Sequence, residues 1–117
     1  MTSDKRRHTR IDSLNLSYVC IDENNIVVHE GMGRTLNVSE SGILLEIHFY
    51  AEITHYLSLT IAFDDELVDI RGKIVHSRTG RHGTYEAGVE FVEMDEQGLR
   101  TLKKYIKLFR EYEDSGQ

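Results

Sequence analysis

Six short extended stretches follow one another along this chain, and in most of them apolar and polar residues alternate. Such alternation is typical of β-strands with one buried face, because successive side chains of a strand point to opposite sides. The stretches cover residues 14–20, 26–38, 43–47, 57–63, 68–76 and 85–91. Clusters of Gly, Asn, Asp and Ser separate them, and the chain contains no proline. Short strands joined by closely spaced turns predict an antiparallel β-sandwich or a small β-barrel.

The same pattern predicts local details. Ile74 and His76 fall on one face of the fifth stretch, because they are two residues apart. Gly31 and Gly33 lie inside the second stretch and indicate a bulge or a sharp bend. The connection "AEITH" at 51–55 is expected to contain a helical turn.

The spacing of apolar residues changes after the last strand. Leu99, Leu102, Ile106 and Phe109 recur at intervals of three and four, which predicts an amphipathic helix of roughly fifteen residues within 95–112,. Asp95 is placed to cap its N-terminus. We expect the apolar stripe to cover one open end of the barrel. The helix cations are expected to form a solvated face: Arg100, Lys103, Lys104, Lys107 and Arg110.

Charge is distributed unevenly along the 117 residues, a length that fits one domain,. The formal net charge is -6, yet residues 1–10 carry +3 and the remaining residues carry -9. An acidic body repels a phosphate backbone, so binding to long nucleic acid is not expected, nor is a single-stranded nucleic-acid barrel with a basic groove. The basic segment could hold a small anion or could be a solvated tail.

Several other classes of protein do not fit the sequence. No stretch is apolar and long enough to span or insert into a membrane, and the N-terminus does not resemble a signal peptide, so we expect a cytoplasmic protein. Cys20 is the only cysteine and is expected to be buried, without a disulfide,. The histidines show no metal-ligand spacing, and no nucleophile is paired with a base. We therefore expect neither a metal site nor an enzyme.

Two short motifs stand out against this background. "RRHTR" at 6–10 contains Arg-x-x-x-Arg, and "NVSESG" at 37–42 contains Asn-x-Ser-x-x-Gly. The two motifs, in this order and followed by the later strands and the helix, resemble the sequence pattern of the PilZ domain family. "DIRGKIVHS" at 69–77 and "YEAGVEFVEMDEQGLRTLKKYI" at 85–106 are also similar to that family. The resemblance covers nearly the whole chain.

The resemblance implies a mainly β fold: a six-stranded antiparallel barrel with a C-terminal α-helix and a flexible basic N-terminal segment. It divides the chain into an arm over 1–12, a barrel with its helix over 13–112, and a tail over 113–117. It also implies binding of cyclic di-GMP, a bacterial second messenger, with no further cofactor. Standalone domains of this length are often monomers, and the number of messenger molecules bound stays open.

The arginine motif suits such a ligand. A guanidinium bonds phosphate oxygens in a bidentate manner, matches the O6/N7 edge of guanine and stacks on bases. We expect Arg6 and Arg10 to make the main contacts. Arg7 either assists them or is solvated.

The remaining candidates lie in or after the second motif. Asn37 and Ser39 could bond a guanine base or could simply cap the turn. Gly42 is expected to supply positive φ or room for close approach. His76 stands where the family often has tryptophan or another aromatic residue, and it could stack on guanine or be an ordinary half-exposed strand residue.

The resemblance also suggests how a signal could be passed on. Charge repulsion would keep the arm loose until two ligand phosphates neutralise Arg6 and Arg10, and an unidentified downstream protein would read the changed surface. The alternative is a PilZ-like adaptor that no longer binds ligand and works only through protein contacts.

Overall fold

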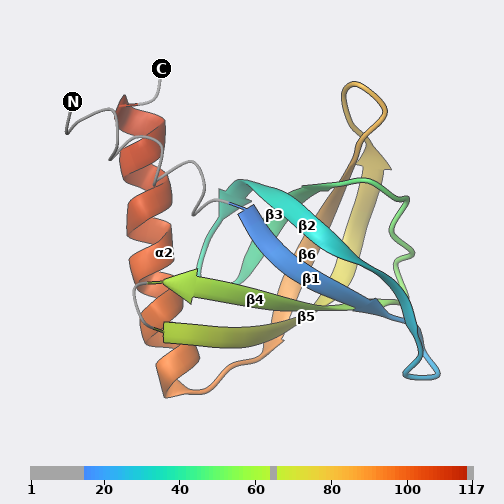
Figure 1. Ribbon diagram of the computed structural model, residues 1–117, viewed down its shortest axis with the longest axis horizontal. Helices are drawn as coiled ribbons and strands as arrows, with labels where there is room; N and C mark the ends of the chain where they lie inside the picture. Colours follow the sequence, from blue (N-terminus) through green and yellow to red (C-terminus); the bar gives the residue numbers. More distant parts are fainter. Residues whose placement is uncertain (1–14, 64–65, 116–117) are drawn as a thin grey trace.

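The computed structural model describes residues 15–63 and 66–115 and shows a closed barrel with one helix beside it (Figure 1). The strands are β1 (Asn15–Ile21), β2 (Val27–Val38), β3 (Gly42–Ile47), β4 (Tyr56–Phe63), β5 (Glu66–Thr79) and β6 (Tyr85–Glu93). They pair in the order β1-β2-β3-β6-β5-β4, and every pairing is antiparallel. The predicted six-stranded antiparallel barrel is therefore confirmed.

The alternation seen in the sequence fills the barrel interior. Every second side chain is buried along β1, β3, most of β4 and the first part of β5, whereas the start of β2 and the ends of β5 and β6 are exposed or half-buried. The buried set includes Leu16, Tyr18, Cys20, Leu57, Leu59, Ile61, Ile70, Ile74, Ala87 and Val89. Full burial of one Val, Leu or Ile side chain contributes about 1.5–3 kcal/mol, so this pattern is the main source of the fold's stability.

The bulge suggested for Gly31 and Gly33 is not at these residues. The β1–β2 ladder keeps its register past both glycines, which lie against the Tyr18 side chain, and it shifts only where Cys20 pairs with His29 and Ile21 with Val27. Further irregularities occur between Thr35 and Asn37 on β2 and, in the β5–β6 ladder, between Arg71 and Gly72 and between Ile74 and His76. Residues 51–55 form a single turn, in which the His55 N–H donates to the Glu52 carbonyl at 3.1 Å, and the turn does not continue into a helix.

The helix α2 (Glu96–Ser115) has 20 residues and is longer than expected. Asp95 caps it as predicted, because its Oδ1 accepts a hydrogen bond from the Gly98 N–H at 2.8 Å,. The helix continues past residue 112 since no glycine or proline interrupts it before Gly116,.

Helix α2 packs against the end of the barrel at which β2 and β4 finish and β5 begins (Figure 1). Leu102, Tyr105 and Phe109 are buried there. The Tyr105 hydroxyl and Thr35 Oγ1 share a hydrogen bond of 2.5 Å, and Thr101 Oγ1 donates to Glu66 at 2.7 Å. These contacts fix the helix next to the 39–42 turn. Its five cations are exposed, as expected.

Replacing Tyr105 by phenylalanine is expected to lower the unfolding free energy by about 1 kcal/mol, because Thr35 loses its buried partner. Burial raises the pKa of Tyr105 to about 12, although the Thr35 bond lowers it. The neutral phenol therefore stabilises the fold below pH 10, and this contribution is lost as the pH rises towards 12. Urea unfolding at pH 7 to 11 would measure both effects. Tyr112→Phe is the control, and equal losses in both variants would contradict the prediction.

Candidate functional site

Four of the β-strands bring the second motif and His76 onto one outer face. Asn37 on β2 pairs with Leu44 on β3, Leu44 pairs with Gly88 on β6, and Gly88 pairs with His76 on β5. We call these four positions the site row. They face outward, because the flanking residues Ile43, Leu45, Ala87 and Val89 are buried. Measured along the curved sheet, three strand spacings of about 4.8 Å give the row a length of roughly 14 Å.

Both ends of the site row lie at β-bulges. The β2 register shifts between Thr35 and Asn37, and the β5 register shifts between Ile74 and His76. The second bulge corrects the expectation that His76 shares a face with Ile74: Ile74 is buried, whereas Val75 and His76 are both exposed. An extra residue in one strand reverses the facing of everything after it, and bulges re-aim side chains in this way beside functional sites.

The turn after Asn37 is held by its own polar groups. The Ser39 N–H donates to the Gly42 carbonyl at 2.9 Å, and Ser39 Oγ accepts from the Ser41 N–H at 3.3 Å. Asn37 Oδ1 accepts from the Val38 N–H at 2.9 Å, which leaves the amide NH₂ group of Asn37 available,. Asn37 and Ser39 are both exposed. These side chains brace the turn and still present polar groups to solvent.

Gly42 provides room for a close approach and does not adopt positive φ. A Cβ at this position would lie only 2.4 Å from the Val89 carbonyl oxygen on the neighbouring strand. Among the described glycines, only Gly83 has a positive φ. Of the two expected roles, the structure therefore supports the steric one.

The turn and the site row border a shallow hollow of about 330 Å³. Its lining includes Asn37, Ser39, Ser41, Gly42, Leu44, Val75, Gly88 and Glu90. His76 lies beside it, since a Cβ on Gly88 would come within 2.9 Å of the His76 Cβ. Glu90 was not singled out from the sequence, because an outward-facing polar residue on a strand resembles ordinary solvated surface.

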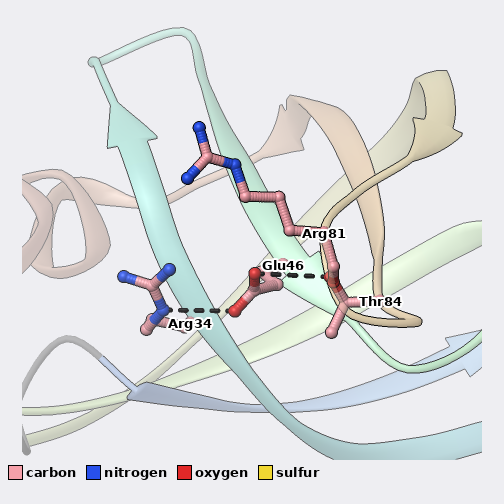
Figure 2. A network of polar contacts seen from close by, with 4 residues as sticks. All are labelled: Arg34, Glu46, Arg81 and Thr84. Atoms are coloured by element: carbon pink, nitrogen blue, oxygen red, sulfur yellow. Dashed lines mark hydrogen bonds and ion pairs between the residues drawn. The ribbon is translucent and has the colours of Figure 1, made fainter.

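Among the described residues that line the hollow, none is a lysine or an arginine. The next outward-facing row consists of Arg34, Glu46, Glu86 and Arg78, and its charges are paired. Arg34 Nε donates to Glu46 at 3.2 Å, and Arg78 Nε donates to Glu86 at 2.8 Å. Figure 2 shows that Glu46 also contacts Thr84. The Thr84 hydroxyl donates to the backbone carbonyl of Arg81 at 2.6 Å as well. Cations for a bound anion would therefore come mainly from outside the hollow. Arg6, Arg7 and Arg10 lie outside the described residues.

One trio of side chains has the order of a nucleophile, a base and an acid. Cys20 Sγ lies 4.0 Å from His55 Nδ1, and His55 Nε2 lies 3.6 Å from the Glu23 carboxylate. The thiol is fully buried, as predicted for Cys20. Burial, together with the Asp22 charge, raises its pKa to about 11, so it stays protonated at neutral pH,. This trio does not present a nucleophile to a substrate.

Two further features are absent from the part of the chain that the structure describes. Residues 15–63 and 66–115 contain no cluster of three or more His, Cys, Asp or Glu side chains suited to a metal ion. The described helix is too polar to cross a membrane.

The closed barrel, the helix at its end and the exposed Asn-x-Ser-x-x-Gly turn define a small all-antiparallel β-barrel domain with a polar outer face. A comparison with protein families matches the PilZ domain over residues 4–108, and the chain belongs to this family. PilZ domains are regulatory and binding domains. No curated protein sequence is significantly similar to this chain.

Solved structures agree on the fold. The PilZ domain of CeSA from a cellulose-synthesizing bacterium is 14% identical, with a TM-score of 0.55, over 84% of this chain and 95% of that one. The Bacillus subtilis inhibitor of motility MotI/DgrA is 14% identical, with a TM-score of 0.60, over 90% of this chain and 50% of that one. The PilZ domain of YcgR from Escherichia coli, solved with c-di-GMP, is 12% identical, with a TM-score of 0.55, over 87% and 88%.

Proposed function

We propose that this protein is a cytoplasmic, monomeric receptor for cyclic di-GMP. The observation that carries the proposal is the site row, which places Asn37 and His76 on one outer face beside the Ser39–Gly42 turn and a hollow. Membership of the PilZ family supports it, and so does the likeness to the YcgR domain that was solved with c-di-GMP.

The ligand's phosphates and bases would be bound by different parts of the chain. Since residues 15–63 and 66–115 contribute no cation to the lining of the hollow, the phosphates would be bound by Arg6 and Arg10, with Arg7 as an additional contact,. The amide NH₂ group of Asn37, which has no partner among the described residues, suits guanine O6 or N7, both of which are acceptors,. The exposed imidazole of His76 can stack on a base at the other end of the site row,.

The signal to a downstream protein would come from a change in the N-terminal arm, residues 1–12. Ordering it costs about 1–2 kcal/mol per residue, and charge-assisted hydrogen bonds to phosphate offset this at about 1.5–3 kcal/mol each. The closed arm would change the surface beside the 39–42 turn, which a partner protein could recognise.

Asn37→Ala is expected to weaken binding of cyclic di-GMP about tenfold, because the site loses one hydrogen-bonding side chain within its hollow. Isothermal titration calorimetry of the parent and the variant measures the effect and the stoichiometry. Asn24→Ala, at the exposed β1–β2 turn, is the control. If the parent gives neither heat nor a thermal shift with cyclic di-GMP, the receptor proposal is wrong and the adaptor alternative replaces it.

A further inference from the structure

Glu90 is a carboxylate in the wall of the hollow. It lies on β6 in register with Gly42 on one side and Lys73 on the other. Its side chain is exposed and, within the described part of the chain, has no hydrogen-bond or ion-pair partner, Lys73 included. Gly42 and Glu90 both line the hollow, so a ligand in the hollow can reach the carboxylate.

A free carboxylate restricts what can occupy this part of the hollow. It accepts hydrogen bonds only, and it repels phosphate. A phosphate of a cyclic dinucleotide would therefore avoid Glu90, and one of its bases would lie there. Guanine carries two parallel donors, N1–H and the 2-amino group, which match the two oxygens of a carboxylate, whereas the corresponding edge of adenine carries an acceptor at N1.

We infer that Glu90 is the residue that selects guanine, by accepting hydrogen bonds from N1–H and the 2-amino group of one base of the bound cyclic dinucleotide. This inference rests on the proposed function, and it assigns the orientation of the ligand: one base towards Glu90 and Gly42, the phosphates towards the arm. Glu90 thus acts on specificity, whereas Arg6 and Arg10 supply most of the affinity.

A thermodynamic cycle tests the inference. Cyclic di-GMP and cyclic di-inosine monophosphate, which lacks only the 2-amino groups, are titrated into the parent and into Glu90→Ala. We expect the parent to prefer cyclic di-GMP by about tenfold or more, and this preference to disappear in Glu90→Ala. Glu93→Ala is the matched control, because Glu93 is also exposed on β6 but does not line the hollow. It should keep the preference of the parent.

The possible outcomes separate this inference from the proposed function. If Glu90→Ala weakens both ligands equally, or leaves the preference intact, the specificity role is wrong while the receptor proposal stands. If Glu90→Ala binds cyclic di-GMP more tightly, the carboxylate competes with the ligand for the arm arginines, and the inference is again wrong. If the parent binds neither dinucleotide, both proposals are wrong. Matching thermal midpoints would show that the variants are folded.

Discussion

Replacing both Arg6 and Arg10 by alanine is expected to reduce the affinity for cyclic di-GMP by about a hundredfold to ten-thousandfold. The part of the chain that the structure describes lines the hollow beside the Asn37–Gly42 motif with no cation, and the arginines of the neighbouring row already bond Glu46 and Glu86. A ligand with two phosphates would therefore depend on the arm for its charge-assisted hydrogen bonds, each worth roughly a tenfold to hundredfold change in affinity. Calorimetric titration of the double variant measures the loss.

Two controls separate the arginine geometry from charge alone. Lys5→Ala removes a neighbouring cation outside the Arg-x-x-x-Arg motif and should change affinity by less than about threefold, as expected for a charge that makes no direct bond to the ligand. Arg6→Lys/Arg10→Lys keeps the charge but loses the planar fork, so it should bind more weakly than the parent and more tightly than the alanine variant. Equal binding by the lysine variant and the parent would show that the arm contributes only charge.

The double variant also tests whether the arm closes when the ligand binds. Amide hydrogen exchange in residues 4–12 should slow when saturating cyclic di-GMP is added to the parent, and should be unaffected in the double variant. The thermal midpoint without ligand should be the same in both proteins, because the two substitutions leave every residue of the described core, from Leu16 to Phe109, unchanged. Unchanged exchange in the parent at saturation would contradict arm closure.

The fold was predictable from the sequence because apolar residues recur at different intervals in the strands and in the helix. Alternation from Leu16 to Phe91 marks the strands, and the spacing from Leu99 to Phe109 marks the helix. The choice of a barrel came from the PilZ resemblance, since alternation alone also allows a sandwich. The pairing order of the strands was not predicted and is known only from the structure. The length of α2 was underestimated because its last turns carry polar residues that show no apolar period,.

The site was predictable in part. Asn37, Ser39 and Gly42 form a contiguous motif, and they lie together as their spacing suggests. The facing of His76 was not predictable, because the bulge at Val75 depends on how β5 pairs with β6, and the residues of β5 itself continue the alternation through it,. Glu90 was missed for a related reason. It lies beside Gly42 only because β3 pairs with β6 in this register, and the sequence does not show that register.

Gly42→Ala is expected to destabilise the barrel by about 1–3 kcal/mol and to abolish binding of cyclic di-GMP. The added Cβ would meet the Val89 carbonyl oxygen at 2.4 Å, and a backbone atom in a paired strand can move only if the β3–β6 ladder moves with it,. The turn from Ser39 to Gly42 would shift, since Ser39 N–H bonds the Gly42 carbonyl. Urea unfolding and calorimetry measure the two effects.

Gly31→Ala is the matched control for Gly42→Ala. It also adds one methyl group to a strand glycine, but the nearest atom is the Tyr18 hydroxyl oxygen at 3.2 Å, at the far end of a side chain that can adjust. Its cost should be below about 1 kcal/mol, with ligand affinity unchanged. If Gly42→Ala loses stability but binds cyclic di-GMP as the parent does, the glycine serves only the ladder, and the ligand cannot lie in the hollow that Gly42 lines. Because Glu90 is in register with Gly42, that result would also remove the base position proposed for Glu90.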